Sequence, residues 1–293
     1  MDADRVLAGI VVYEPDRAQL LRLVTAIAPQ VGEVVIYANS AVPEAFESDL
    51  RAVAGPALLS VLRPPGNVGL GSAYNAIAGH ARIRRSEFVL LLDQDSLPGA
   101  GCVAALRAGF IALDAAGERP ALIGPQPLGG ENAPMRAPRD GAAGPRDLVP
   151  VSFAISSGSL IRREVLDAVG PFRADFFIDA IDTEWCLRAR ARGFSVWMAA
   201  GVPMTHALGR GVMRLPLGLL VPDQPPRRVY TMIRNQLALM RLGHVPASFK
   251  VKALVSLPLR IAAHLVRDRG SRAMQAAIGR GLVDGVRNRL GPP

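Results

Sequence analysis

Two aspartates follow the most apolar segment of the chain, where they could hold a cation. Asp93 and Asp95 flank Gln94 directly after residues 88–92, which read FVLLL. Ligands of α/β proteins bind outside the carboxyl ends of strands, and residues two apart in an extended segment point the same way. The two carboxylates can therefore converge on Mg²⁺ or Mn²⁺ shared with phosphate oxygens. The alternative is a solvated turn in which Asp95 caps the next helix.

A second acidic cluster lies at the start of a predicted helix. Asp179, Asp182 and Glu184 occur within six residues, followed by Trp185 and Arg188. A group that takes a proton from a hydroxyl must be a carboxylate or a histidine held at the substrate, so this cluster is a candidate source of a general base. In the alternative interpretation, Asp182 caps the helix and Glu184 pairs with Arg188 one turn later.

Three weaker signals could complete a site. The turn at 67–71 contains Gly69 and enters a predicted helix, and such helix N-termini accept anions; Tyr74 stands where a dinucleotide fingerprint needs its third glycine. His206 follows a predicted strand and could be a metal ligand if it meets Asp95 in space. The arginines of residues 227–235 could hold a diphosphate or form an ordinary basic helix face.

Alternating strands and helices must position these residues. Short apolar runs predict strands at 6–13, 34–37, 58–62 and 88–92, and helical periodicity predicts helices at 16–29 and 72–84. This order indicates an α/β fold with a parallel sheet whose faces are both covered. The pattern also predicts the later strands 151–155, 160–161 and 194–198, and helices at 163–169, 183–192, 227–242, 248–267 and 271–290.

One stretch of the chain is predicted to be a long surface loop. Thirteen of the 34 residues at 117–150 are Gly or Pro, and long loops in compact domains are often functional. A short strand at 121–123 is the one element that we expect near its start. The loop separates the strand–helix pattern described above from the second acidic cluster.

Composition and charge limit the class of protein. Half of the 293 residues are apolar, enough for a sizeable core, and two cysteines, Cys102 and Cys186, are too few for a disulfide framework or a structural zinc site. Residues 201–293 contain 15 Lys or Arg against 3 Asp or Glu, whereas residues 1–200 contain 19 against 22. The basic tail indicates an anionic partner, a nucleic acid or a lipid surface. With 5% aromatic residues and no recognition module, nucleic acid is not expected.

The sequence also carries expectations about location. The first 16 residues have an acidic start and a short apolar run, so we expect no signal peptide. No uncharged apolar stretch reaches about 18 residues, so we expect no membrane-spanning helix. A cytoplasmic protein, peripheral to the inner face of the plasma membrane through its basic tail, is the resulting prediction. A helical cap that packs on the rest of the chain is the alternative for the tail.

Taken in order, these motifs resemble the inverting family 2 glycosyltransferases of GT-A fold, and most of all the bacterial rhamnosyltransferase-type enzymes of cell-surface polysaccharide assembly. The resemblance covers roughly residues 6–240. The residues that carry it are Tyr13, Asn67, Gly69, Asn75, Asp93-Gln94-Asp95, Ser156 to Leu160, Phe177 to Asp179, Asp182 to Arg188, His206 and Arg234-Asn235.

The resemblance implies a domain organisation. Residues 1–225 are expected to form the GT-A catalytic domain, a Rossmann-like and mostly parallel sheet flanked by helices. Within it, residues 1–95 would bind the nucleotide and residues 96–225 the acceptor. Residues 226–293 are expected to form a basic helical C-terminal region.

The resemblance also implies roles for individual residues. Asp182 would be the base, with Glu184 or Asp179 as the alternatives, and Asp95 would hold a divalent cation with His206 as a second ligand. The nucleotide sugar would contact Tyr13, Asn39, Asn67, Gly69, Asn75, Asp93, Gln94 and Arg234. The acceptor side would be formed by Ser157, Gly158 and Trp185.

The implied activity is the transfer of a sugar, rhamnose being our expectation, from a dTDP- or UDP-linked donor. The acceptor would be a hydroxyl of a cell-surface glycan or a lipid-linked molecule, and the enzyme could be a homodimer. Two alternatives remain open at this point. One is a glycosyltransferase-like binding protein that has lost catalysis, and the other is a sugar-phosphate nucleotidyltransferase. The second would need a Gly-rich, Arg-bearing loop after the first strand, where this chain has Tyr13-Glu14-Pro15-Asp16.

Overall fold

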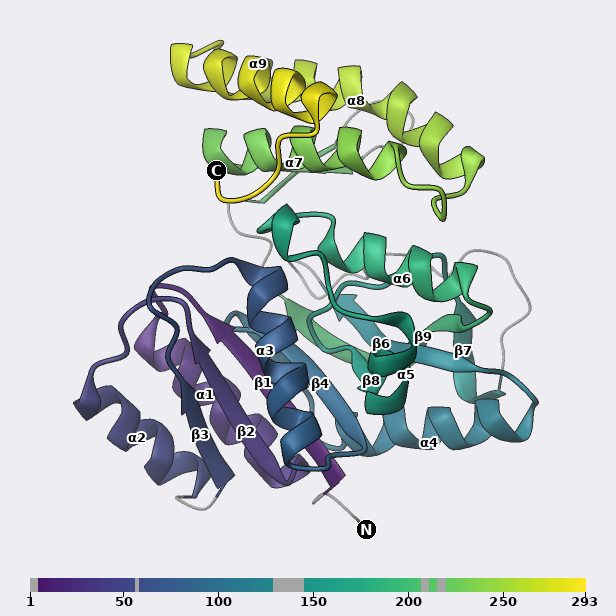
Figure 1. Ribbon diagram of the computed structural model, residues 1–293. Helices are drawn as coiled ribbons and strands as arrows, with labels where there is room; N and C mark the ends of the chain where they lie inside the picture. Colours follow the sequence, from purple (N-terminus) through teal and green to yellow (C-terminus); the bar gives the residue numbers. More distant parts are fainter. Residues whose placement is uncertain (1–4, 56–57, 129–144, 207–210, 215–219) are drawn as a thin grey trace.

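The structure is a computed structural model that describes residues 5–55, 58–128, 145–206, 211–214 and 220–293. A nine-stranded sheet with the order β3-β2-β1-β4-β8-β6-β9-β5, and with β7 also paired to β9, forms the body of this part of the chain. Helices cover both faces of the sheet, and a layer of three helices lies above one of its edges (Figure 1). The expected α/β fold is confirmed.

The first half of the sheet is parallel. Strands β1 (Val6–Val12), β2 (Glu33–Ala38) and β4 (Phe88–Asp93) are almost wholly buried, because their continuous apolar runs face helices on both sides. Strand β3 (Leu59–Leu62) completes the parallel set. The connecting helices are α1 (Arg17–Ile27), α2 (Glu44–Ala54) and α3 (Leu70–Ile83), with a 3-10 turn η2 (Ala28–Gln30) after α1.

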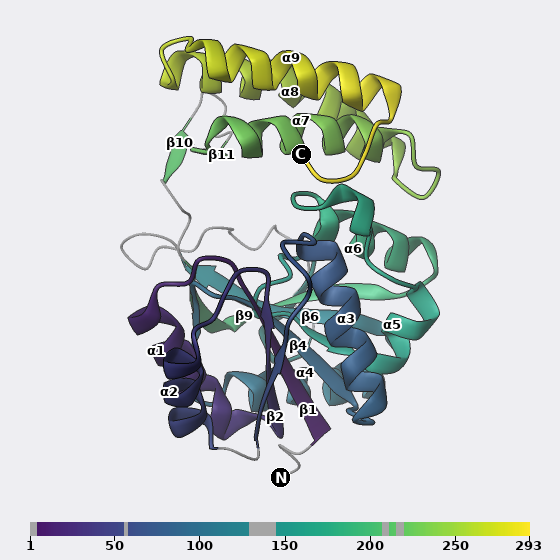
Figure 2. The same cartoon turned by 60° about the vertical axis from the view of Figure 1, so that its left-hand side comes forward.

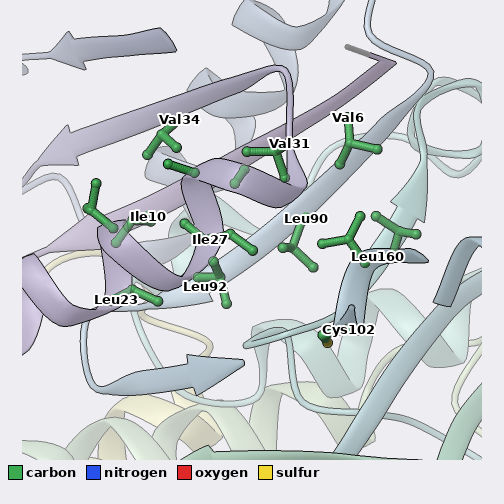
Figure 3. Packing of buried hydrophobic residues seen from close by; sticks show 14 of the residues in the cluster. Val6, Ile10, Leu23, Ile27, Val31, Val34, Leu90, Leu92, Cys102 and Leu160 are labelled. Carbon is green, nitrogen blue, oxygen red and sulfur yellow. The ribbon is translucent and has the colours of Figure 1, made fainter. Parts of the chain in front are cut away.

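Side chains alternate between two cores along these strands. Figure 3 shows one core, in which alternate residues of β1 and β4 pack against α1; the labelled members include Val6, Ile10, Leu23, Ile27, Leu90 and Leu92. The intervening residues of the same strands pack against α3, α5 and α6 on the opposite face. Because β1, β2 and β4 are parallel, the polar residues that end these strands lie at the same edge of the sheet.

The second half of the sheet is mixed. Strand β8 (Leu160–Arg162) lies antiparallel between β4 and β6 (Pro120–Leu128), and β6 runs parallel to β9 (Ser195–His206). The short strands are β5 (Ser96–Pro98) and β7 (Leu148–Pro150), both antiparallel to β9. The helices are α4 (Cys102–Ala115), α5 (Arg163–Val169) and α6 (Ile181–Ala191), with 3-10 turns η5 (Pro145–Asp147) and η6 (Ala174–Phe176).

Two sequence predictions about the middle of the chain were wrong. Residues 120–128, placed mostly in a loop because of their prolines, form the nine-residue strand β6, whose pairing with β9 shifts register between Pro125 and Gln126. Such a bulge lets a strand accommodate residues that cannot donate a ladder hydrogen bond. Residues 151–155 form no strand, since β7 ends at Pro150. Residues 129–144 of the predicted loop lie outside the described residues.

The three predicted tail helices are confirmed as α7 (Pro226–Met240), α8 (Ala247–Arg267) and α9 (Arg272–Arg287). They follow the short hairpin of β10 (Val212–Arg214) and β11 (Leu220–Pro222). The three helices form one layer (Figure 2). They share a small core of their own, formed by Val229, Ile233, Leu257, Met274 and Ile278. None of the described helices has the length and apolar character of a membrane span.

Glycines bring α9 close to α7. A Cβ atom on Gly285 would lie 2.7 Å from Leu237 Cδ1, and one on Gly281 would lie 2.9 Å from the carbonyl oxygen of Tyr230. The two helices can therefore pack at this distance only because these positions carry no side chain. The layer also meets the body of the molecule, where Ala238 and Leu239 of α7 join the core that contains α6.

Candidate active site

A cavity of about 1360 Å³ lies at the carboxyl ends of β1, β2 and β4. Tyr13 follows β1, Asn39 follows β2, and Asp93 and Asp95 stand at the end of β4; all four line the cavity, and so does Asp182 on α6. The opposite wall is formed by residues of α7 and α8. The two acidic clusters, 84 residues apart at their closest members, are thus brought into one cavity.

Gln94 ties the ends of β1 and β4 together. Its Oε1 accepts a hydrogen bond of 2.8 Å from the Tyr13 amide, and its Nε2 donates one of 3.1 Å to the Tyr13 carbonyl. Tyr13 itself is 45% exposed and lies over the cavity. Gln94 therefore fixes the main chain of Tyr13 against the end of β4, in addition to lining the cavity.

Asp93 is held in place by buried hydroxyl groups. Its amide donates to Ser157 Oγ (2.9 Å), and its Oδ1 accepts from the buried Tyr74 hydroxyl at 3.4 Å. Tyr74 also contacts Ser156 Oγ at 2.7 Å. Burial, with the charge of Asp93, raises the pKa of Tyr74 well above its usual value, so the phenol stays protonated. Ser157 thus lies behind Asp93, and its neighbour Ser156 lines the cavity.

The main-chain amides of the glycine turn before α3 donate hydrogen bonds to other groups of the protein, so they are not available to an anion. Asn67 Oδ1 accepts from the Gly69 amide (3.0 Å), Asn39 Oδ1 accepts from the Val68 amide (3.2 Å), and the Leu70 amide donates to the Phe177 carbonyl at 2.6 Å. Gly69 has φ +82°, and a Cβ there would lie 2.6 Å from that carbonyl. Only glycine fits this close approach. Asn39, Asn67 and Gly69 all line the cavity.

A strained loop precedes Asp182. Phe177, Asp179 and Ala180 have φ values of 63°, 68° and 61°, a region that non-glycine residues rarely adopt. Each such residue costs about 1–3 kcal/mol and persists only where neighbouring contacts enforce it. Here α7 supplies the contacts: Asn235 Nδ2 lies 2.9, 2.7 and 3.0 Å from the carbonyl oxygens of Phe176, Ile178 and Asp179.

Asp182 is the second residue of α6 and faces the cavity. Its Oδ1 accepts a 2.7 Å hydrogen bond from the Thr183 amide. Burial raises the pKa of the Asp182 carboxyl; backbone donors at Thr183 and Ser156 oppose this rise, and the charge of Asp179 adds to it. A carboxylate of raised pKa, held at a helix N-terminus and open to a cavity, can accept a proton from a bound hydroxyl.

Asp179 lies in the same cavity but is already paired. Arg228 Nη2 donates to its Oδ1 at 2.6 Å, and Thr231 Oγ1 donates to its Oδ2 at 2.5 Å. The pKa of Arg228, although lowered by its burial, is raised on balance by Asp179, with Asp93 and Asp95 contributing. Arg228 therefore lies within electrostatic reach of all three carboxylates, and Asp179 serves to anchor it.

Glu184 and Trp185 were predicted to belong to the site, but the structure places both outside the cavity. Glu184 is 1% exposed, and Arg188 donates to both of its oxygens at 2.9 Å while His244 lies 3.0 Å away. Trp185 is fully buried, donates to the Gly170 carbonyl at 3.0 Å and stacks on Phe172. A separation of two residues along the helix turns Glu184 to the side opposite Asp182, and Trp185 packs into the hydrophobic core, so neither lines the cavity.

Asn75, Arg234 and Gly158 were also predicted to belong to the site, and they too lie outside the cavity lining. Asn75 exchanges two hydrogen bonds with the Phe172 backbone, and Arg234 is buried and donates to the carbonyls of Phe176 and Gly291. Gly158 (φ +79°) lies so close to Met204 that a Cβ would meet its sulfur at 2.5 Å. These three positions are occupied by protein contacts and do not line the cavity.

The main chain of His206 lies beside the first acidic cluster. In the antiparallel pairing of β5 with β9, His206 is the partner of Ser96, which directly follows Asp95. No group of three or more His, Cys, Asp and Glu side chains that could hold a metal occurs within the described part of the chain. Mg²⁺ and Mn²⁺ need fewer, because one or two carboxylates and substrate phosphates commonly suffice. Asp93 and Asp95 fit that pattern.

Sequence reasoning missed one wall of the cavity. Lys252, Ser256 and Arg260 of α8 line it. Their spacing of four residues places them on one side of a helix. That spacing was visible in the sequence, but nothing there showed that this side would face the strand ends.

The comparisons with known proteins agree with this geometry. No protein-family model matches the chain. Over 104 residues the chain is 36% identical to the dTDP-rhamnosyl transferase RfbF of Shigella flexneri; the alignment covers 36% of this chain and 35% of that protein, about a third of the relative's length.

Solved structures extend the likeness to the whole chain. The structure of residues 1–349 of S. aureus TarS in complex with UDP-GlcNAc is similar with a TM-score of 0.62 and 14% identity, over 97% of this chain and 81% of that one. The mannosyltransferase PcManGT from Pyrobaculum calidifontis, in complex with GDP-Man and Mn²⁺, has a TM-score of 0.57 and 18% identity, over 97% and 88%. At such identities these likenesses establish the fold. The chain therefore has the GT-A glycosyltransferase fold, and its expected resemblance to the rhamnosyltransferase-like glycosyltransferases is confirmed.

Proposed function

We propose that this protein is a glycosyltransferase that moves a sugar from a nucleoside diphosphate donor to an acceptor hydroxyl. The observation that carries the proposal is that Asp95, at the end of β4, and Asp182, at the start of α6, line one cavity. Sugar transfer needs both a group that stabilises the departing diphosphate and a base that takes the acceptor proton. The likeness to RfbF supports rhamnose as the sugar and dTDP as the carrier, with UDP as the other candidate.

The strand ends would hold the donor. Tyr13 and Asn39 border the part of the cavity at β1 and β2, where the base and ribose would lie, and Asp93 and Asp95 border the part that would take the diphosphate. Asp95, with Asp93, would hold a divalent cation, which supplies charge neutralisation for the leaving group. The Mn²⁺ and GDP-Man bound to the similar mannosyltransferase support this arrangement. Arg228 adds positive charge near the same carboxylates.

Asp182 would act as the base. The acceptor hydroxyl attacks the anomeric carbon from the face opposite the diphosphate, the bond to the diphosphate oxygen breaks, and Asp182 takes the hydroxyl proton. A single displacement of this kind inverts the anomeric configuration. NMR of the product, in which the one-bond carbon–proton coupling at the anomeric centre reports its configuration, would test this. A product that keeps the donor's configuration would contradict direct attack.

Replacement of Asp95 by Ala is expected to abolish the metal-dependent part of nucleotide binding, because the cation would lose its carboxylate ligand. Isothermal titration of dTDP and UDP in Mn²⁺, with and without a chelator, measures this. Asp49→Ala, on α2 and away from the cavity, is the control and should bind like the unaltered protein. Equal affinity of the unaltered protein with and without chelator would contradict the metal role.

The tail supports a peripheral contact with the inner face of the plasma membrane, where a lipid-linked or growing glycan acceptor would be met. Helix α8 exposes apolar side chains that a folded helix normally buries: Val251 is 61% exposed, Leu254 60% and Val255 65%. Lys250 directly precedes them, and Lys252, which lines the cavity, borders them on the other side. An exposed apolar stripe with flanking lysines is typical of an interfacial helix, and each basic residue near anionic lipid adds about 1 kcal/mol of attraction.

Co-sedimentation with vesicles of phosphatidylglycerol and phosphatidylcholine tests the membrane contact. The double variant Leu254→Gln, Val255→Gln is expected to sediment less than the unaltered protein, because it removes buried apolar area in the bilayer interface. Ile83→Gln, an exposed apolar residue on α3, is the control. Absence of sedimentation at low salt would contradict the proposal, and a change of oligomeric state in the α8 variant would instead assign this face to a homodimer.

A further inference from the structure

One wall of the cavity carries cations that the proposed chemistry does not use. Lys252, Ser256 and Arg260 follow one another at intervals of four residues along α8, so their side chains lie on the same side of the helix, and all three line the cavity. They face a space whose other wall carries Asp93, Asp95 and Asp182. The cavity is thus acidic at the strand ends and basic along α8.

Arg260, like Arg228 a half-buried arginine of the cavity, is not neutralised in the way that Arg228 is. Arg228 forms an ion pair with Asp179. By contrast, Arg260 Nε is buried and has no hydrogen-bond partner among the described residues. Burial lowers the pKa of Arg260, and no carboxylate offsets that effect. A buried donor without a partner is costly, so the retention of this one on a half-buried arginine at a cavity indicates that an anionic ligand completes it.

The anion that fits is not the diphosphate of the donor. Asp93 and Asp95 contribute to the raised pKa of Arg228, whereas burial is the cause of the lowered pKa of Arg260; this difference favours a place for Arg260 outside the part of the cavity assigned to the donor. The volume of about 1360 Å³ exceeds the roughly 300–1,000 Å³ typical of a site for one small ligand. Room therefore remains for a second substrate along α8.

We propose that Lys252, Ser256 and Arg260 bind a phosphate group of the acceptor. This inference rests on the proposed glycosyltransferase function and names the chemical class of its acceptor. The arginine fork and the lysine ammonium would contact the phosphate oxygens, and the Ser256 hydroxyl would donate a further hydrogen bond. Met232 of α7 and Phe249 of α8 line the same cavity, so an apolar chain attached to the phosphate would find apolar contacts there.

Calorimetric titration at saturating Mn²⁺ and nucleoside diphosphate, dTDP or UDP according to which binds, tests the inference, because the donor part is then occupied. The probes are farnesyl diphosphate, inorganic diphosphate and farnesol. Farnesyl diphosphate is expected to bind the unaltered protein, and its affinity is expected to fall about 10- to 100-fold in the double variant Lys252→Gln, Arg260→Gln, the loss typical of charged hydrogen bonds. Lys250→Gln, on the same helix but outside the cavity lining, should bind like the unaltered protein.

The arms of the experiment separate the sources of the phosphate. Farnesyl diphosphate binding better than inorganic diphosphate assigns a lipid phosphate, and equal binding of the two assigns a phosphate without a lipid. Equal binding of farnesol and farnesyl diphosphate, undiminished binding in the double variant, or no binding of any phosphate probe overturns the inference. Loss of nucleoside diphosphate binding in the double variant would assign these residues to the donor and also overturn it. If the unaltered protein binds neither dTDP nor UDP, the glycosyltransferase proposal itself fails, and the inference falls with it.

Discussion

Replacing Asp182 by Asn is expected to lower turnover by about 10²–10⁴-fold, the range that a positioned general base contributes. Asparagine keeps the Oδ1 that accepts the Thr183 amide, so the local structure is preserved while the proton acceptor is lost. Affinity for the nucleotide sugar should persist, because the donor is assigned to the strand ends. Rates of nucleoside diphosphate release at saturating donor and acceptor, together with donor titrations, measure the two effects separately.

The pH dependence of the unaltered enzyme gives an independent check. Because burial raises the pKa of Asp182, the base is protonated and inactive at pH values where an ordinary carboxyl is already ionised. The acid limb of kcat/KM should therefore lie above the usual carboxyl range, with activity rising as the pH increases through it. Ionised Asp182 is also disfavoured in the folded state above that pKa, so Asp182→Asn should be at least as stable as the unaltered protein at neutral pH.

The matched control is Asp114→Asn, since Asp114 is an aspartate of α4 that pairs with Arg162 outside the cavity. It should keep full turnover. Undiminished turnover in Asp182→Asn would remove Asp182 from the role of base, and a melting temperature well below that of the unaltered protein would assign its effect to folding.

Replacing Asn235 by Ala is expected to lower the free energy of unfolding by about 2–4 kcal/mol. The Asn235 amide shares its two N–H bonds among three carbonyl groups of the loop that leads to Asp182. The Phe176 carbonyl keeps its hydrogen bond from Arg234, so the substitution leaves the carbonyls of Ile178 and Asp179 without this donor, at a cost of about 1–3 kcal/mol each when they stay dry. The strained φ values of Phe177, Asp179 and Ala180 would then lack the contact that enforces them. Urea unfolding followed by circular dichroism measures the change.

The same substitution should also lower turnover more than donor affinity, because it displaces the loop that carries Asp179 and leads to Asp182, and not the strand ends. Gln275→Ala is the control: Gln275 is an exposed amide on α9 with one hydrogen bond to the Gly270 carbonyl, and its loss should cost below about 0.5 kcal/mol. A loss of stability in Asn235→Ala no larger than in this control would contradict the role assigned to α7.

The parallel half of the fold was predictable because burial on both faces forces a continuous apolar run onto each strand. Residues 6–13, 34–37 and 88–92 show this directly, and the rule that ligands bind at the carboxyl ends of strands located Asp93 and Asp95. The amphipathic helix α2 was overlooked, although Phe46, Leu50 and Ala54 are buried at intervals of four residues. Strand β6 was obscured by its prolines, which a bulged pairing accommodates.

The candidate site was only partly predictable, because residue type does not reveal which polar side chains form hydrogen bonds or ion pairs within the protein and are therefore not open to a ligand. Glu184 and Asp182 are both carboxylates and lie two residues apart on α6. Asp182 lines the cavity, whereas Glu184 forms a buried ion pair with Arg188. Arg234 suits a phosphate, yet the fold uses it to satisfy backbone carbonyls. The carbonyls that Arg234 binds, those of Phe176 and Gly291, come from segments far from it in the sequence, and no pattern in the sequence shows that they meet it.

The central claim is that the cavity at the strand ends binds a sugar nucleotide and cleaves it with the aid of a divalent cation. The most direct test is to incubate the unaltered protein with a panel of dTDP-, UDP- and GDP-linked sugars in Mg²⁺ or Mn²⁺, with and without a chelator, and to measure nucleoside diphosphate release. We predict that at least one donor, with dTDP-rhamnose the first expectation, releases its nucleoside diphosphate, and that chelation stops the release. Binding and release of none of these donors, or release that chelation leaves unchanged, would contradict the account.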